Sequence, residues 1–434
     1  MATASHSIPA DRMAVLFAVM LVAAAGNTAM QSILPAIGAK LHIPDVWVSL
    51  AFSWSALLWV LTAPYWARQS DKRGRKVLMA LGVAGFLSSM AFCGLILWAG
   101  LSGLIGAGVT FIAFALFRSL YGGLGSAAPP AVQAYVASRT DPEQRTQALS
   151  LVSSSFGLGT VIGPAAAPFF ILPVVGLAGP MLVFALIGLV VLIMLRWRLP
   201  DDMPRFAARG AIAPYPLSAG PQEPTGEEEN EPGAPEQEPL SWRDRRVRPW
   251  LLAGFFGGQA QAMMLGVIGF LILDRLHLRL KPDEGASMTG IVLMAGAFAT
   301  LLAQWGLIPL FKLTPRPTVL AGAVLALVGI LMTGLAQDLH AIVIGFALGS
   351  LGFGLFRPGF TAGASLSVPR RDQGAVAGMT ASINGSAYII SPAIGVLLYN
   401  WHPMVAYGLM AGFCIWLVAW GRSALRQQPA PGPR

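Results

Sequence analysis

Two arginines lie inside apolar segments that are long enough to cross a membrane. Arg118 is near the middle of the segment 102–136, and Arg357 is near one end of the segment 341–366. Because a guanidinium keeps its charge at any physiological pH, each side chain needs hydrogen-bond acceptors away from bulk water. Guanidinium groups bind carboxylates in a forked geometry, so an anionic or zwitterionic solute is one acceptor that would suit both arginines.

Structural explanations for the same two arginines remain open. Arg118 can bind backbone carbonyls, or the side-chain amides of Asn27 or Gln31 on the first apolar segment. Arg357 can extend its charged end toward the nearer membrane surface or pack beside Pro358. The sequence alone therefore leaves a structural role and a solute-binding role for each arginine.

Acidic side chains do not occur in the middle of the apolar segments. None of the 20 Asp and Glu residues lies there, and the five His residues lie in loops or near the amino terminus. Asp71 falls in the first loop that we expect to be cytoplasmic, and Asp274 falls at the outer end of the segment 250–273. Two cations without an acid between them would favour an anionic solute and disfavour a cationic one.

Uncharged polar and aromatic side chains within the segments could complete a solute site. The polar candidates are Asn27, Gln31, Gln259, Gln261, Gln304 and Asn384, and the aromatic candidates are Trp54, Trp59, Tyr121 and Tyr388. Each of these residues alone is more often explained by hydrogen bonding between helices or by core packing than by contact with a solute.

Twelve apolar segments must position these residues. They cover residues 13–37, 46–66, 77–99, 102–136, 147–170, 178–195, 250–273, 287–310, 318–336, 341–366, 375–399 and 403–421. Charged residues make up only 11% of the 434 residues, against about 25% in an average soluble domain. The first segment is too long for the apolar core of a signal peptide, so we expect a retained helix. The sequence therefore predicts an all-α polytopic membrane protein.

The basic residues predict the orientation of these helices. If both termini are cytoplasmic, the residues that fall on the opposite face are only Lys40, Arg275, Arg279 and Lys281. Cytoplasmic loops carry an excess of Lys and Arg, so this orientation in a plasma (inner) membrane is favoured. The net charge of +9 is distributed over short loops and forms no basic surface on a soluble domain. That distribution argues against a nucleic-acid partner.

The chain divides into two related halves. The Pro-rich segment 196–248 contains an acidic run, 227–231, and predicts a disordered cytoplasmic linker. It separates an N-terminal six-helix bundle, 1–195, from a C-terminal six-helix bundle, 249–434. A shift of 228 residues places Pro130 on Pro358, Ser154 on Ser382, Gly157 on Gly385 and Pro164 on Pro392. These ordered matches indicate an internal duplication in which both copies run in the same sense.

The loop after the second segment carries a charged motif. Residues 67–76 are Ala-Arg-Gln-Ser-Asp-Lys-Arg-Gly-Arg-Lys, in which Gly74 permits a tight turn and Asp71 can accept charge-assisted hydrogen bonds. The loop resembles the one between helices two and three of the major facilitator superfamily, through Asp71, Gly74, Arg75 and Lys76, although Ala67 replaces the leading glycine. The resemblance implies a conformational latch between the halves on the cytoplasmic side. An ordinary basic loop is the alternative.

Two further motifs are similar to patterns of the same superfamily. The run from Arg118 to Gly125 resembles the R-x-x-x-G-x-x-G pattern of its fourth helix. Gly159, Gly163 and Pro164 resemble the G-x-x-x-G-P signature of its antiporters, although the following glycine pair of the antiporters is absent here. The stretch 118–164 is most similar to the tetracycline-type and multidrug proton antiporters. Simple close packing of helices through small residues explains the glycines equally well.

The resemblance implies a major facilitator superfamily fold of 12 transmembrane helices, with a central site between two six-helix bundles and rocker-switch alternating access. It gives more weight to Asn27, Gln31, Gln259 and Gln261, because the first and seventh helices line the cavity in this family. It also implies a monomeric secondary transporter in the lipid bilayer that exports small organic compounds, coupled to proton antiport. The alternative substrates are organic anions, such as carboxylate metabolites or a carboxylate siderophore, bound by Arg118 and Arg357.

Other classes of function find little support in the sequence. It contains no phosphate-binding loop, metal-ligand spacing or nucleophile–base pair, so we expect no cofactor, no metal, no ATP-driven step and no enzymatic activity. A receptor or scaffold that transports nothing is a third class on the same fold. Such a protein would show no solute flux and would bind a partner through the segment 196–248.

Overall fold

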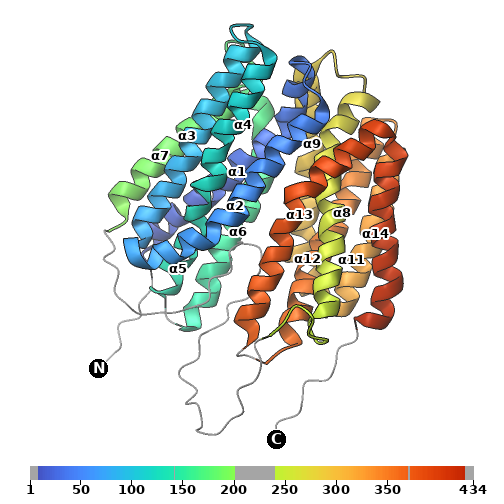
Figure 1. Cartoon of the computed structure of the whole chain (residues 1–434). Helices are drawn as coiled ribbons and strands as arrows, with labels where there is room; N and C mark the ends of the chain where they lie inside the picture. Colours follow the sequence, from blue (N-terminus) through green and yellow to red (C-terminus); the bar gives the residue numbers. More distant parts are fainter. Residues whose placement is uncertain (1–7, 141, 201–239, 370–371, 426–434) are drawn as a thin grey trace, which may run out of the picture.

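The computed structural model describes residues 8–140, 142–200, 240–369 and 372–425. The regular elements in these ranges are helices (Figure 1). The N-terminal half contains α1 (Ala10–Lys40), α2 (Asp45–Arg73), α3 (Arg75–Leu101), α4 (Ala107–Gly123), η1 (Gly125–Ala127), α5 (Ala128–Ala137), α6 (Pro142–Ala166), η2 (Ala167–Phe170) and α7 (Gly179–Arg198). The C-terminal half contains α8 (Arg248–Arg275), α9 (Pro282–Leu301), η3 (Leu302–Leu307), α10 (Ile308–Phe311), α11 (Pro315–Leu335), α12 (Leu339–Leu366), α13 (Gln373–Trp401) and α14 (Pro403–Ala424).

The fourth and eighth predicted apolar segments form helices with a change of geometry inside them. α4, η1 and α5 make up the fourth segment, in which Gly123 and Gly125 precede Pro129. Glycine weakens a helix and proline lacks a backbone N–H, so the hydrogen-bond pattern changes at this point. α9, η3 and α10 make up the eighth segment, and η3 has π-helical spacing. Such wider turns are frequent at functional sites of helices.

Eleven helical segments of the described chain are long and apolar enough to cross a membrane, including Ala107–Ala137 and Pro282–Phe311. α6 is not in this group, because the side chains of several residues of its first half lie outside what the structure describes. It packs against α1 and α9. The expectation of an all-helical polytopic bundle is confirmed.

The helices form two groups that lean against each other (Figure 1). In the first half α1 packs on α6 and α7, and α3 packs on α4 and α7. In the second half α12 packs on α9 and α11, and α8 packs on α13 and α14. Contacts between the halves are made by α2 with α13 and by α9 with α1 and α6. Small residues allow this packing: a Cβ on Gly329 of α11 would lie 2.1 Å from the backbone nitrogen of Gly349 of α12.

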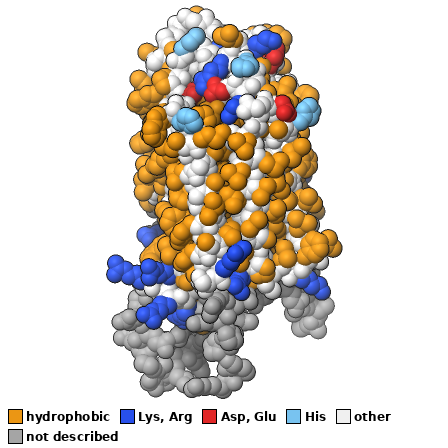
Figure 2. Space-filling view, turned by 90° about the vertical axis from the view of Figure 1, so that its right-hand side faces the viewer, with side chains coloured by type: hydrophobic (Ala, Val, Ile, Leu, Met, Phe, Trp, Pro, Cys, Tyr) orange, Lys and Arg blue, Asp and Glu red, His pale blue; other side chains and the backbone are white. Residues whose placement is uncertain are grey.

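The outer surface of the bundle is apolar between two charged ends (Figure 2). In this view Lys and Arg side chains gather at the lower end, whereas Asp, Glu and His side chains, with a few Lys and Arg, gather at the upper end. Large apolar side chains such as Ile112, Leu116 and Ile344 are exposed on the helices between these ends. An apolar belt of this kind is what the hydrocarbon core of a bilayer requires.

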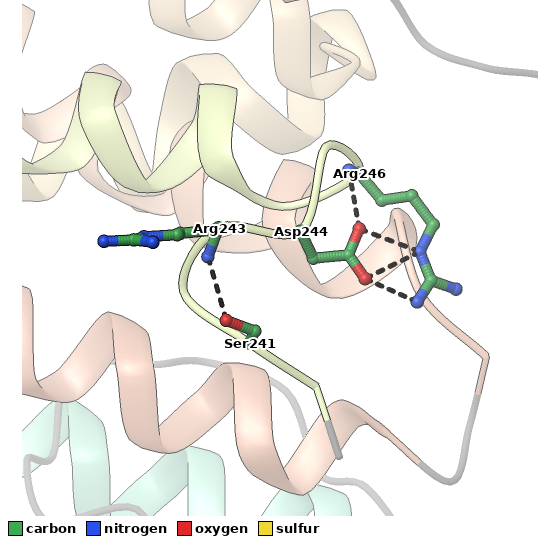
Figure 3. A network of polar contacts seen from close by, with 4 residues as sticks. All are labelled: Ser241, Arg243, Asp244 and Arg246. Carbon is green, nitrogen blue, oxygen red and sulfur yellow. Dashed lines mark hydrogen bonds and ion pairs between the residues drawn. The ribbon is translucent and has the colours of Figure 1, made fainter. Parts of the chain in front are cut away.

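The chain between the halves is ordered just before α8 (Figure 3). The backbone N–H of Arg246 donates to Asp244 Oδ1 at 2.9 Å, and its Nη2 donates to Asp244 Oδ2 at 2.7 Å. The Arg246 guanidinium holds the pKa of the Asp244 carboxyl below its usual value. Val247 is fully buried and anchors the turn to the C-terminal half.

The predicted linker needs correction at both ends. Residues 196–198 belong to α7, and residues 240–247 form the turn that leads into α8. The hydrogen bonds of Asp244 and the burial of Val247 explain the order at the second end. Residues 201–239, which include the acidic run, lie outside the described part of the chain.

Candidate functional site

A cavity of about 310 Å³ lies between the two halves. Residues of α1, α2, α4 and α6 line it from the first half, and residues of α8, α9, η3, α12 and α13 line it from the second. The volume is at the lower end of the range of small-molecule sites, about 300–1,000 Å³. The wall is largely apolar, and its polar members are Asn27, Thr28, Gln31, Ser49, Ser55, Trp59, Arg118, Tyr121, Thr160, Gln261, Thr300, Gln304, Ser350, Arg357 and Tyr388. Among the described lining residues there is no Asp, Glu, His or Lys.

Arg118 is the most deeply buried charged side chain at this cavity. It is 2% exposed, and its guanidinium carbon lies 4.4 Å from the ring centroid of Tyr121 and 6.0 Å from that of Phe52. Its Nη2 donates to Oδ1 of Asn27 on α1. The hydrogen bond to Asn27 that one structural explanation predicts is therefore present.

Asn27 satisfies only part of the Arg118 guanidinium. Nε and Nη1 are both buried and have no hydrogen-bond partner among the described residues. A buried donor without an acceptor costs about 1–3 kcal/mol, and more when it is charged. The side chain thus has two donors without a partner among the described residues, and protein atoms cover both in this conformation.

Arg357 is placed differently, on α12 of the second half. It is half-buried, and its Nε donates to Oδ1 of Asn384 on α13 at 3.2 Å. Its Nη2 is buried and has no hydrogen-bond partner in the described chain. Both arginines therefore line the cavity, each is held by one amide, and each has at least one buried nitrogen without a hydrogen-bond partner among the described residues.

The remaining predicted polar residues separate into two groups. Gln31, Gln261 and Gln304 line the cavity together with Asn27, and Gln304 lies in the π-helical η3. Gln259 and Asn384 are not among the lining residues. Gln259 accepts a hydrogen bond from Ser391 of α13, and Asn384 holds Arg357. These two amides therefore connect helices and contact the site only through their neighbours.

The aromatic wall is formed by three of the four predicted residues. Trp59, Tyr121 and Tyr388 line the cavity, and the rings of Trp59 and Tyr121 are 5.1 Å apart. Trp54 does not line it: the side chain is 47% exposed, and Nε1 donates to Ser119 Oγ at 2.7 Å. The prediction for Trp54 is wrong because this residue lies on a face of α2 that points away from the second half.

The glycine motif of α6 packs against α1. A Cβ on Gly159 would lie 2.4 Å from the carbonyl oxygen of Leu21, and one on Gly163 would lie 2.2 Å from that of Ala25. Pro164, in contrast, lines the cavity. A Cβ on Gly290 of α9 would lie 2.7 Å from the carbonyl oxygen of Pro164. The glycines hold α1 close to α6, while the proline meets the other half.

The charged motif lies at the junction of α2 and α3. Gly74 joins the two helices with φ of 91°, a conformation that glycine adopts without strain. Arg75 donates to Ser138 Oγ, directly after α5 in the same half, and Lys76 is buried. The Asp71 side chain lies outside what the structure describes, so the predicted latch stays a prediction.

One group of charged residues was not expected from the sequence. Arg279, in the loop between α8 and α9, binds Asp45 at the start of α2 through Nη2 and Oδ2 at 2.7 Å. This ion pair joins the two halves. The one signal in the sequence for this ion pair is that both residues lie at or near loops on the side of the membrane predicted to be external. Groups of three or more possible metal ligands do not occur among the described residues.

Comparisons with known proteins agree with this architecture. The model of the Major Facilitator Superfamily matches residues 16–314. Multidrug resistance protein 2 of Bacillus subtilis (strain 168) is 25% identical over 414 residues, covering 92% of this chain and 91% of that protein. Multidrug resistance protein MdtG of Proteus mirabilis (strain HI4320) is 28% identical over 145 residues, covering 32% of this chain and 33% of that protein.

Solved structures show the same fold at low sequence identity. A bacterial homologue of the human lysosomal transporter Spinster, in an inward-facing and occupied conformation, has a TM-score of 0.68 at 14% identity and covers 96% of this chain and 98% of that chain. The human organic anion transporter MFSD10 (TETRAN) has a TM-score of 0.59 at 18% identity, with 96% and 100% covered. The chain therefore belongs to the Major Facilitator Superfamily and is a multi-pass membrane transporter of small molecules, not an enzyme.

Proposed function

We propose that this protein is a secondary active exporter of small organic compounds that works by alternating access. The observation that carries the proposal is the largely apolar cavity between the two halves, with arginines and amides as its polar points. An apolar wall with a few fixed polar groups suits a small organic molecule. The multidrug resistance proteins to which the chain is similar support export as the direction.

The charges at the cavity favour a narrower candidate, the transport of organic anions. Arg118 and Arg357 both line the cavity and keep unpaired nitrogens, while the described lining residues offer no carboxylate. Once a rearrangement of the side chains uncovers these nitrogens, a carboxylate would provide the acceptors that they lack. A cationic drug would meet two like charges in a partly desolvated space, which costs free energy. Carboxylate-bearing metabolites or siderophores of suitable size fit this candidate.

Coupling to protons is part of the proposal. The antiporter-like motif of α6, with Gly159, Gly163 and Pro164, supports it. The described lining residues include no carboxylate or imidazole, so we propose that a coupled proton binds away from the cavity wall. We further propose that both termini lie on the cytoplasmic side of an inner membrane and that the protein is a monomer.

A flux experiment tests the substrate charge. The purified protein is reconstituted in liposomes, and uptake of size-matched cationic, neutral and anionic aromatic compounds is measured with and without a pH gradient. We expect saturable flux of the anions, which the pH gradient accelerates. Flux of the cations alone would contradict the organic-anion candidate and leave the general exporter. The absence of flux for every compound would contradict both.

A further inference from the structure

Asp45 is the one acidic residue among the buried polar residues of the described chain, and it lies at the contact between the halves. Its side chain is 7% exposed at the first turn of α2. Arg279 binds it with two nitrogens: Nη2 to Oδ2 at 2.7 Å and Nη1 to Oδ1 at 3.2 Å. Forked pairs of this kind are strong and directional. The two residues are 234 positions apart and belong to different halves.

Arg279 is held in place from its own half. Its Nε donates to Oδ1 of Asp274, the next-to-last residue of α8. The other oxygen of Asp274 accepts a hydrogen bond from the Tyr399 hydroxyl of α13 at 3.0 Å. The hydrogen bonds that Arg279 donates to Asp45 and to Asp274, in that order of effect, raise the pKa of Arg279, so the guanidinium keeps its charge. If the halves separate, Arg279 therefore stays with Asp274, and the bonds to Asp45 are those that break.

The pair lies just beyond the wall of the cavity. Ser49, one helical turn after Asp45 on α2, lines the cavity. Pro35 of α1 and Gly269 of α8 also line it, and a Cβ on Gly269 would lie 2.5 Å from the Pro35 ring. A tight contact between the halves and an ion pair therefore lie in succession between the cavity and the end of the bundle predicted to be external.

We propose that Asp45 and Arg279 form an outer clamp that keeps the cavity closed toward the external side, with Asp274 and Tyr399 as the residues that position Arg279. Opening of the cavity to that side must break both hydrogen bonds between the halves. The outer clamp thus sets how often the transporter faces outward. The inference rests on the proposed alternating access but not on any substrate.

Cysteine labelling tests the outer clamp without a transported solute. In a background with Cys93→Ala and Cys414→Ala, Ser49→Cys is labelled in right-side-out vesicles by a membrane-impermeant maleimide. Asp45→Asn removes the ion pair with little change of volume, and we expect labelling about tenfold faster or more. Asp274→Asn should give a smaller increase, because Arg279 keeps its partner but loses its support. Equal labelling rates of Asp45→Asn and the parent would overturn the proposal.

The same loop offers a matched control. Lys281 and Glu284 form an ion pair at 3.3 Å within the second half, so Glu284→Gln removes a nearby charge without touching the contact between the halves. It should leave the labelling rate unchanged. An increase equal to that of Asp45→Asn would show a general effect of charge and overturn the outer clamp.

A charge reversal keeps the test decisive if a single variant accumulates poorly. In an Asp274→Asn background, which avoids two facing carboxylates, Asp45→Arg and Arg279→Asp should each accelerate labelling, and the double variant should return it toward the rate of Asp274→Asn alone. A double variant that labels as fast as the single ones would contradict a direct pair. No labelling from the external side in any variant, with labelling from the opposite side, would instead contradict alternating access itself.

Discussion

The two halves provide the cavity with matched backbone positions but with different chemistry. The shift of 228 residues that aligns the halves in the sequence also pairs residues that line the cavity, namely Gly157 with Gly385, Thr160 with Tyr388 and Pro164 with Pro392. Glycine and proline are therefore kept at positions where helices meet or bend. The side chains that give the cavity its polarity have diverged.

The arginines show this divergence most clearly. The same shift pairs Arg118 with Phe346, which is also fully buried and lines the cavity. The arginine of the second half, Arg357, instead falls next to Pro358, the counterpart of Pro130. The cavity is thus symmetric in its framework and asymmetric in its charge. An asymmetric site of this kind would suit the proposed organic anion, with one anionic end and an apolar body.

The largest effect that we predict is on Arg118. Arg118→Ala should reduce transport to background, at least about 100-fold, because it removes a charged donor and leaves Asn27 without its partner. Phe346→Leu, at the paired position, should keep most of the activity, since it changes an apolar contact only. Flux is measured in liposomes that contain equal amounts of each variant. Normal transport by Arg118→Ala would remove the arginine from the mechanism.

A second prediction compares two glycines of α6. Gly163→Ala should lower the free energy of unfolding by about 1–3 kcal/mol, because the new Cβ meets the carbonyl oxygen of Ala25. The melting temperature and the yield of the protein should fall with it. Gly157→Ala should be close to the parent, because the nearest atom to its Cβ would be Leu301 Cδ2 at 3.6 Å. Thermal unfolding in detergent measures both variants. Equal destabilisation would contradict the assignment of Gly163 to the contact with α1.

Arg357 should matter less than Arg118 and in a different way. Arg357→Ala should raise KM for an anionic solute roughly tenfold and change kcat little, because the side chain is half-buried and a solute contact is lost. Asn384→Ala leaves the charge in place but removes the acceptor at 3.2 Å, so we expect a smaller increase in KM. A fall in kcat with unchanged KM would indicate a structural role for Arg357.

The smallest predicted effect concerns the loops that join the second and third helices of each half. In the first half this loop turns at Gly74 and follows Asp71. In the second half it turns at Lys312, with φ of 46°, and has no acidic residue between Phe311 and Pro315. Asp71→Asn should lower turnover a few-fold without weakening solute binding, if the loop is a latch. A loss of affinity at unchanged turnover would contradict that role.

The sequence predicts the helices and their pairing into halves because the physical signals are local. Each membrane span needs a long apolar run, and the repeated glycine and proline positions reveal the duplication. Arg118, Gln31, Gln261 and Arg357 could be predicted as cavity residues because polar groups in a membrane helix face the interior of the bundle.

Contacts between distant residues could not be predicted in the same way. The face of α2 that carries Trp54 depends on how α2 packs against α4, and its apolar sequence gives no clear period. The pairing of Asp45 with Arg279 depends on how the two halves meet. The amides Gln259 and Asn384 were expected at the cavity, yet their helices turn them toward Ser391 and Arg357.

The central claim is that two arginines from unequal positions in the halves recognise one anionic group. The most direct test is equilibrium binding of aromatic carboxylates and their uncharged amides, paired compound by compound, to the purified parent, Arg118→Gln and Arg357→Ala proteins. We predict that the parent prefers each acid by roughly 10- to 100-fold, and that both variants lose most of this preference. Equal affinity of the parent for acid and amide, or an unchanged preference in both variants, would contradict the account.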